Sequence, residues 1–385
     1  MSDREFQIVV LGATGFTGRL VARWLAETQP ELRWAMAGRN LTKLQGVRDD
    51  VAQRTPAAAS VPLIEVDVSK PDTVQAMAGR TQVVLTTAGP FTLYGPPVVQ
   101  ACVDQGTDYV DITGEPGFVA DMVRTHHEAA AAKGLRIISC CGMDSVPFDM
   151  GAWFAVQQLP QQQAIDVRGY FKANARVSGG TWNTIVEILS RGSGSTEGLV
   201  YRGPDRRARS LPTKVHRSPH GDWGVPVPTV DPLIVMRSAQ LLGYGPAFRY
   251  AHHVRLSSMA RIAGLGLGFA GVAALCKLPG GSRWLGNRIP PGTGATEEQM
   301  AAGWLKADFH ATEGAVATHV RLTTDIDPGY SFTARMIACA ALCLVYDRDE
   351  LAHAGVVTTA AAMAVPYRRR LEQAGMGFHI IESPA

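Results

Sequence analysis

The stretch Leu11-Gly12-Ala13-Thr14-Gly15-Phe16-Thr17-Gly18-Arg19 decides the fold of the first half of this chain. It follows an apolar run typical of a buried strand and precedes a stretch with helical spacing, which is the context of a dinucleotide-binding turn. Gly12 allows a tight turn, Gly15 lets the backbone approach a pyrophosphate at the helix N-terminus, and Gly18 lets the helix pack closely on the strand. A tight turn without a ligand is the alternative interpretation.

Short apolar runs alternate with amphipathic stretches after this turn, so the sequence predicts an α/β fold with a doubly wound parallel sheet. The expected strands are Phe6–Leu11, Arg33–Ala37, Pro62–Val66, Gln82–Thr87, Asp108–Ile112 and Leu135–Cys140. The expected helices are Thr17–Thr28, Leu41–Gln53, Pro71–Ala78, Pro96–Gln105 and Phe118–Lys133. The alternation changes after about Asp149, and a chain of 385 residues is long enough for about two domains.

The composition excludes several classes of protein. With 46% hydrophobic and 18% charged residues, the chain can bury a large core and is not intrinsically disordered. A net charge of +3 gives no reason to expect nucleic acid as a partner. The six cysteines contain no CxxC pair, and charged residues at Asp3, Arg4 and Glu5 are unlike the start of a signal peptide. We therefore expect a cytoplasmic protein without disulfides or zinc.

The end of the second expected strand indicates which dinucleotide is bound. It reads Ala37-Gly38-Arg39-Asn40-Leu41-Thr42-Lys43 and offers no carboxylate for the ribose 2′-hydroxyl of NAD. Arg39 offers a planar guanidinium, and Lys43 a point charge, to the 2′-phosphate of NADP. The sequence therefore favours NADP. The alternative, that Arg39 is a solvated loop residue, leaves the missing acid unexplained.

Polar residues also follow other strands, at the sheet edge where a doubly wound fold binds its ligand. Tyr94, Glu115 and Asp144 follow the fourth, fifth and sixth strands and are the candidates for a catalytic acid or an orienting group. Each could instead cap a turn or a helix, and Asp144 precedes Pro147 in a sequence typical of a helix start. The residues expected to bind the cofactor are Gly12, Thr14, Gly15, Phe16, Thr17, Gly18, Arg39, Asn40, Lys43, Asp67, Val68, Thr87, Ala88, Gly89 and Pro90.

Other kinds of site find no support in the sequence. None of the nine tyrosines is followed by lysine at the Tyr-x-x-x-Lys spacing, and neither G-x-S-x-G nor H-E-x-x-H occurs. The adjacent pairs His126-His127 and His252-His253 do not make a metal-binding face, and His216 and His220 lie among prolines and glycines. We expect no metal site and interpret these histidines as surface or core residues.

Two segments of the second half have unusual compositions. Ile262–Leu275 is apolar and uncharged, and its fourteen residues are fewer than the roughly 20 needed to span a bilayer. We expect no transmembrane segment, and the alternatives are a buried core helix, an apolar wall of the substrate site and a contact with a membrane surface. Arg202–Arg217 is rich in basic residues and is either a solvated surface or a docking patch for an acidic carrier domain.

Blocks spread over most of the chain resemble the saccharopine dehydrogenase-like oxidoreductases, and within that group the trans-acting enoyl reductases of actinobacterial lipid synthesis. The Gly-Thr-Asp-Tyr and Cys-Gly-x-Asp-Ser-x-Pro blocks are specific to this group, whereas the glycine-rich turn alone is a weak signal. Met143 and Phe148 stand where the related block usually has Phe and Ser. The matching segments are Gly12–Leu20, Ala37–Asn40, Val83–Pro90 with Tyr94–Pro96, Gly106–Glu115, Cys141–Asp149, Val177–Thr181 and Gly355–Met363.

The resemblance implies a Rossmann domain over residues 1–150 and a second α+β domain over 151–340, with the helices of about 340–385 packing back on the first. It implies NADPH-dependent reduction of the double bond of an enoyl thioester, a lipophilic substrate held on an acyl-carrier or polyketide synthase partner. One alternative is reduction of an imine or ketone on an amino-acid-like substrate, and another is a non-catalytic NADP(H)-binding or lipid-associated protein.

Overall fold

In the computed structural model the chain forms two compact units, which are described separately here. Unit 1 comprises Met1–Met143 and Tyr330–Ala374, and unit 2 comprises Asp144–Gly329 and Gly375–Ala385. The described residues are 4–382 apart from 176–181, 183–184, 187–188, 191–193, 200–206, 212, 228 and 289–293. The matching segment Val177–Thr181 and the basic residues Arg202 and Arg206 therefore lie outside the described residues.

The boundary between the units differs from the expected one near residue 150. Residues after the sixth strand are still bonded within unit 1, because the backbone N–H of Cys141 donates to Asp111 O and that of Met143 donates to the Thr333 hydroxyl. The return to unit 1 begins at Tyr330 rather than near 340, and the last strand belongs to unit 2.

Unit 1 contains a parallel seven-stranded sheet of order β14-β6-β5-β4-β1-β2-β3. Six strands match the expected ones, and the seventh, β14, comes from the end of the chain and pairs with β6. Residues Ile8, Val9 and Val10 of β1 are fully buried, as expected for a strand covered on both faces. The strands are β1 (Phe6–Leu11), β2 (Trp34–Gly38), β3 (Leu63–Glu65), β4 (Thr81–Thr86), β5 (Asp108–Asp111), β6 (Arg136–Ile138) and β14 (Gly355–Val357).

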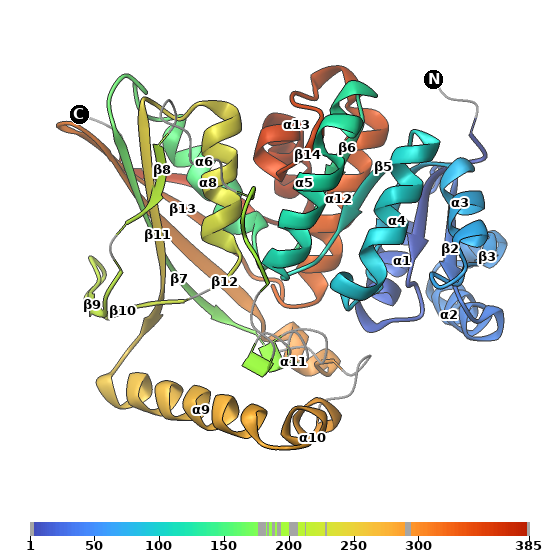
Figure 1. The fold of residues 1–385 in the computed structure, drawn as a ribbon, viewed down its shortest axis with the longest axis horizontal. Helices are drawn as coiled ribbons and strands as arrows, with labels where there is room; N and C mark the ends of the chain where they lie inside the picture. The colour runs from blue at the N-terminus through green and yellow to red at the C-terminus, as the bar shows by residue number, and fades with distance from the viewer. Residues whose placement is uncertain are drawn as a thin grey trace. The chain divides into compact units, whose positions relative to one another are not determined.

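Helices cover both faces of this sheet. Helices α3, α4 and α5 form a row on one face, while α1 and α12 pack against each other on the other (Figure 1). The topological switch point, where ligands bind in such folds, lies between β1 and β4. The helices are α1 (Phe16–Thr28), α2 (Leu41–Arg54), η1 (Pro56–Ser60), α3 (Pro71–Gly79), α4 (Phe91–Gln105), α5 (Pro116–Ala132), α12 (Ser331–Tyr346), η2 (Arg348–Glu350) and α13 (Thr359–Ala374).

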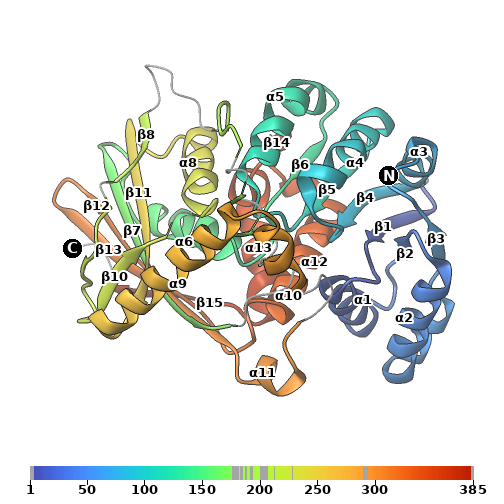
Figure 2. The same ribbon diagram turned by 60° about the horizontal axis from the view of Figure 1, so that its bottom comes forward.

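Unit 2 contains a mixed sheet of order β15-β13-β12-β7-β11-β10-β9, with β8 paired to β11. Strands β7 and β11 run parallel, while β12 is antiparallel to both β7 and β13. The long strands lie side by side in Figure 2. The strands are β7 (Ile165–Asn174), β8 (Arg207–Ser210), β9 (His216–Arg217), β10 (Trp223–Pro226), β11 (Ala247–Leu256), β12 (Trp304–Glu313), β13 (Val316–Thr324) and β15 (Gly377–Glu382).

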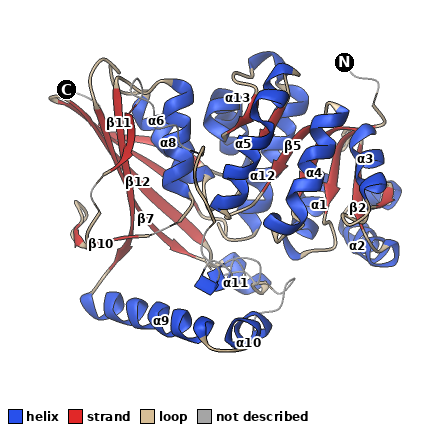
Figure 3. Ribbon diagram, viewed as in Figure 1, coloured by secondary structure: helices blue, strands red, loops and turns tan. Residues whose placement is uncertain are grey.

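The two faces of this sheet differ. Helices α6 (Val146–Val156) and α8 (Asp231–Leu242) pack against each other and against the strands, and both lie on the same side of the sheet in Figure 3. Phe309 of β12 points to the helix side, where its ring packs closely against Gly151 of α6. Because side chains alternate along a strand, the neighbours Asp308 and His310 point to the opposite face. The remaining helices are α9 (Met259–Lys277), α10 (Gly281–Arg288) and α11 (Glu297–Ala301).

Candidate active site

The glycine-rich turn joins β1 to α1 and is closed by close backbone contacts. Gly12 has φ of +87°, a conformation that side chains rarely adopt, and a Cβ there would lie 3.0 Å from the backbone nitrogen of Ala88. A Cβ on Gly18 would lie only 2.3 Å from Gly12 O. The Thr87 hydroxyl donates to Gly12 O at 3.3 Å, so the ends of β1 and β4 meet at this turn.

The N-terminus of α1 has the features that an anion-binding helix end needs. Its N-cap is Gly15, which provides no side-chain cap, and its first turn holds no acidic residue. Arg19 donates to Thr14 O at 3.2 Å and holds the loop against the helix, while Phe16 and Thr17 form the half-buried first turn. The free N–H groups and the helix dipole would hold the pyrophosphate of a dinucleotide, so this turn fits NADP.

Two exposed basic residues follow β2: Arg39 precedes the N-cap of α2, and Lys43 lies in the first turn of that helix. Asn40 has a structural role, because its side chain accepts the backbone N–H of Lys43 at 2.8 Å and caps α2. Asp67 follows β3, and hydrogen bonds from Ser69 lower its pKa, with a smaller contribution from the charge of Arg39. The Asp67 carboxylate thus stabilises the turn in which it lies, and Val68 is the next residue of that turn.

Glu115 is bonded in a way that the sequence did not reveal. Its carboxylate accepts the backbone N–H of Phe91 at 2.9 Å and that of Thr92 at 2.7 Å, as well as the Thr92 hydroxyl. Pro90 is the N-cap of α4 and provides no side-chain cap of its own, so Glu115 satisfies the start of this helix from 24 residues away. This long-range cap explains why α4 begins at Phe91 rather than at Pro96. Glu115 thus has a structural role at the start of α4.

Tyr94 lies on the second turn of α4 and is 41% exposed. It follows Gly89 and Pro90, the last of the expected cofactor-binding residues after β4, and its backbone N–H donates to Pro90 O. The capping of α4 by Glu115 therefore also fixes the turn that carries Tyr94.

Asp111 is a buried carboxyl group that sequence reasoning did not single out. It accepts the N–H groups of Thr113 and Cys140 and the hydroxyl of Ser139, which ties the end of β5 to the end of β6. Burial raises its pKa to about 6, although these hydrogen bonds oppose the shift. Its place after an apolar strand was the available signal, but only the pairing of β5 with β6 shows its partners.

Asp144 is the first residue of unit 2 and follows Met143 directly. It stays accessible to solvent while the protein around it raises the pKa of its carboxyl by desolvation. Asp231, at the start of α8, is buried and accepts hydrogen bonds from Ser145 at 3.4 Å and from Thr229. Burial, and then the charge of Asp144, raise the pKa of Asp231 well above its usual value. The pair therefore combines an exposed residue, Asp144, with a buried carboxyl, Asp231, and the pKa of each is raised by desolvation.

The imidazole beside this pair is neutral. His252 Nε2 lies 3.5 Å from Asp231, but burial lowers the pKa of His252 to about 3. Because desolvation favours the uncharged form of both groups, the contact is a neutral one rather than an ion pair. The ring of His252 packs 4.6 Å from that of Phe148, one of the two departures from the related sequence block.

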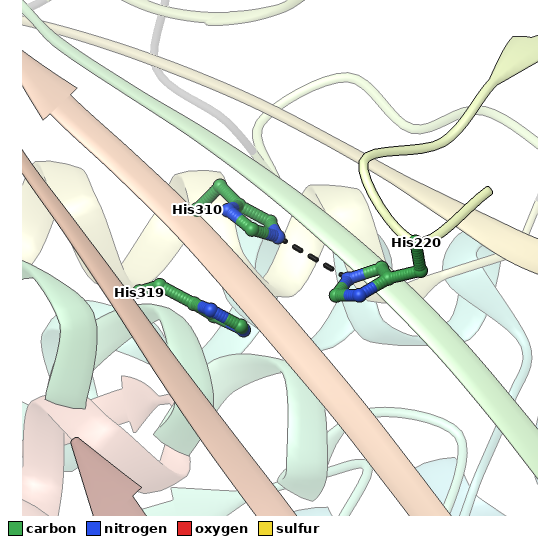
Figure 4. Close-up of side chains that lie close together, drawn as sticks. All are labelled: His220, His310 and His319. Atoms are coloured by element: carbon green, nitrogen blue, oxygen red, sulfur yellow. Dashed lines mark hydrogen bonds between the residues drawn. The ribbon is translucent and has the colours of Figure 1, made fainter. Parts of the chain in front are cut away.

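The open face of the unit 2 sheet gathers three histidines, of which only His220 was considered from the sequence, as a surface or core residue. His310 and His319 are directly opposite each other on β12 and β13, and His220 reaches them from the loop between β9 and β10 (Figure 4). Their ligand atoms lie within 4.8 Å of one another, close enough to consider a metal ion. Only strand pairing brings these residues together, and their sequence spacing contains no such signal.

Charge argues against a cation at this histidine cluster. Asp308 accepts from His319 at 2.9 Å and from Arg321 at 2.6 Å, and Arg255 approaches it to 3.2 Å. Burial opposes the charged form of Asp308, but the hydrogen bonds from His319 and Arg321, with the charges of His220 and Arg321, lower its pKa to about 2. His310 and His220 are hydrogen-bonded to each other at 3.2 Å. The carboxylate is thus already neutralised by two guanidinium groups, which would repel a further cation, and the rings are satisfied internally.

Comparisons with known proteins agree with this geometry. Residues 8–138 match the model of the saccharopine dehydrogenase NADP binding domain. The chain is 34% identical over 418 residues to a trans-acting enoyl reductase of Mycobacterium leprae and 34% over 420 residues to one of Mycobacterium tuberculosis, covering 97% of both proteins in each case. Saccharopine dehydrogenase of Saccharomyces cerevisiae shares the fold, with a TM-score of 0.57 at 14% identity and with 98% of this chain covered.

The matched domain contains the glycine-rich turn and all the basic residues discussed at the end of β2, and the relatives extend over both units. This chain is therefore an NADP-dependent oxidoreductase that belongs to the family of the trans-acting enoyl reductases.

Proposed function

We propose that this protein reduces the carbon–carbon double bond of an α,β-unsaturated acyl thioester, which an acyl-carrier or polyketide synthase partner presents to it. The observation that carries the proposal is the similarity to trans-acting enoyl reductases over 97% of this chain and of its relatives, since it includes both units. A second observation supports the oxidoreductase half of the proposal, namely the uncapped, acid-free N-terminus of α1 behind Gly12.

When bound, NADPH supplies the hydride that adds to the β-carbon of the thioester. The N-terminus of α1 would hold its pyrophosphate, and Arg39 with Lys43 would hold its 2′-phosphate. The π electrons of the double bond move towards the α-carbon and the thioester oxygen, so the α-carbon must then receive a proton. The protein's own contribution is therefore to orient the two reactants and to supply this proton.

We assign the proton to Asp144. Asp144 is an exposed residue, and desolvation by the protein around its carboxyl raises the pKa of that group, which favours the protonated form that a proton donor needs. Asp231 is the carboxyl whose pKa the charge of Asp144 raises further, so the two groups are electrostatically coupled. Tyr94, exposed on α4, is the candidate for orienting the thioester.

The decisive experiment compares two classes of substrate. NADPH consumption is followed with a long-chain enoyl thioester and, separately, with a keto acid plus an amine. Turnover with the enoyl thioester alone is expected, and turnover with the keto acid alone would contradict the proposal in favour of an amino-acid-like substrate. Tight NADPH binding with neither turnover would favour a non-catalytic protein.

Cofactor choice needs its own control. Arg39→Ala removes the planar guanidinium, and charge-assisted hydrogen bonds of this kind contribute roughly 1.5–3 kcal/mol, so NADPH affinity should fall about 10- to 100-fold. NADH affinity should stay the same, because NADH has no 2′-phosphate. Equal losses for the two cofactors in a fluorescence titration would contradict the role of Arg39.

A further inference from the structure

The helix α9 is apolar along its whole length and yet exposed. It spans Met259–Lys277, 19 residues, so it is longer than the expected Ile262–Leu275. Only Cys276 in this helix is buried, so the structure contradicts a buried core helix, one of the three alternatives for this segment. Leu267 is 75% exposed, and Leu265 and Phe269 are also exposed. Ser258 caps the helix by accepting the backbone N–H of Arg261, so its start is well defined.

Among the described residues, its main contacts with the rest of unit 2 lie towards its two ends. The first end follows β11, and the second packs on α10, where Cys276 meets Leu285 and Val186. Figure 2 shows α9 as a rod that ends at α10. A helix that is hydrophobic all round is normally buried in a protein or in a membrane, and unit 2 does not bury this one.

Cationic and interfacial residues flank this apolar helix. The segment 257–288 contains Arg261, Lys277, Arg283 and Arg288 and no acidic residue. Trp284 of α10 is 51% exposed, and the Arg288 guanidinium lies 4.4 Å from its ring centre. Basic side chains and tryptophan next to an exposed apolar surface are typical of segments that lie at the headgroup level of an anionic bilayer.

The connections of α9 argue against a membrane crossing. It is the one helix among the described residues that is long and apolar enough to cross a bilayer, at about 28 Å for 19 residues. However, β11 before it and β12 after it belong to the same sheet, so the chain would have to cross back. Between Lys277 and Trp304 the described helices are α10 and α11, with eight and five residues, which are too short for that.

We infer that α9 and α10 form a docking surface for anionic phospholipid membranes, in which α9 lies in the plane of the interface and its flanking basic residues contact the headgroups. The charge pattern distinguishes this occupant from a second copy of the chain, since a surface with four basic and no acidic residues would repel its own copy. The inference is independent of the reaction proposed above, and its test needs no substrate.

Vesicle co-sedimentation tests this surface. The full chain is mixed with vesicles of phosphatidylcholine alone or with one quarter phosphatidylglycerol. We expect binding to the anionic vesicles, weaker binding to the neutral ones, and a decline with salt. The double variant Leu267→Glu, Phe269→Glu should lose at least about tenfold in vesicle affinity, because each charge must enter the apolar region.

Two controls make the result interpretable. Val365→Glu changes an equally exposed apolar residue of α13 and should keep wild-type vesicle binding. Arg283→Gln should lower affinity about fivefold for the anionic vesicles and leave the neutral ones unchanged. NADPH affinity and Tm report whether each variant is folded. Absence of vesicle binding by the wild type, unchanged binding by the double variant, or a dimer that the double variant dissociates would each overturn the inference.

Discussion

The two sheets of this molecule place their polar groups in different ways. In the parallel sheet of unit 1 the strands are apolar on both faces, and the functional groups stand at the carboxyl ends, as at Gly12, Thr87 and Glu115. In the mixed sheet of unit 2 the polar groups lie on the faces, with His252 under the helices and Asp308 on the open face. The site of unit 1 therefore depends on local turns, while that of unit 2 depends on which strands pair.

The largest effect is expected where backbone contacts in unit 1 are closest. Gly18→Ala places a Cβ 2.3 Å from Gly12 O, so α1 must move away from the turn. Overpacking of this kind costs about 1–3 kcal/mol, and NADPH affinity should fall at least about tenfold because the pyrophosphate turn shifts. Thermal unfolding and a fluorescence titration measure the two effects.

The matched control is Gly46→Ala in α2, where an added Cβ meets no atom within 4 Å. It should stabilise the protein by about 0.5–1 kcal/mol, because alanine is favoured over glycine inside a helix. If Gly18→Ala and Gly46→Ala had the same effect on Tm and on NADPH affinity, the close approach of Gly18 to Gly12 would not determine the conformation of the turn.

A second test concerns Glu115 of unit 1, whose carboxylate accepts hydrogen bonds from the start of α4. Glu115→Gln gives up the charge that accepts the two N–H groups at the start of α4, which should lower stability by about 1–3 kcal/mol. Glu128→Gln, an exposed change on α5, should leave Tm unchanged. If Glu115→Gln kept the Tm of the wild type but lost turnover, Glu115 would be a catalytic acid after all.

A smaller, pH-dependent effect is expected for the buried carboxyl of unit 2. Burial raises the pKa of Asp231 well above its usual value in the unfolded chain, so the folded protein binds one proton more than the unfolded chain between the two pKa values. The stability from this group is complete below the unfolded pKa and declines as pH rises towards the folded one. Asp231→Asn should therefore raise Tm at pH 8 more than at pH 4. A pH-independent change in urea or thermal unfolding would show that Asp231 is ionised in the folded protein.

The smallest effect is expected at the histidine cluster. Because Arg255 and Arg321 already neutralise Asp308, we expect neither Zn²⁺ nor a chelator to change Tm, and Co²⁺ to give no ligand-field absorption. A stoichiometric Co²⁺ spectrum that His310→Ala abolishes would instead establish a metal site on the open face of unit 2.

Much of unit 1 could be predicted from the sequence, because its signals are local. The strands β1 and β5 and the helix α2 lie where the sequence pattern indicated, and the turn at Gly12 fits its expected ligand. Two features of the same unit depend on distant residues: β14 joins β6 from the other end of the chain, and Glu115 caps α4. Neither feature can be predicted from the residues of a single helix or strand, because the partners are far apart in the sequence.

Unit 2 was less predictable for the same physical reason. His310 and His319 are nine residues apart in sequence, and only the β12–β13 hairpin sets them opposite each other. The sequence also could not show whether α9 is buried or exposed, because an apolar run has the same composition in a protein core and at a membrane surface. Asp231, the acid whose pKa the charge of Asp144 raises, lies on α8, far from Asp144 in the sequence.

The central claim is that Asp144 supplies the proton in an NADPH-dependent reduction, and turnover of Asp144→Asn tests it most directly. With saturating enoyl thioester and NADPH, the variant should turn over about 10²- to 10⁴-fold more slowly, with NADPH affinity and Tm unchanged. The wild-type rate should decline as pH rises through the raised pKa of Asp144. An Asp144→Asn variant with the wild-type rate and pH profile would contradict the account.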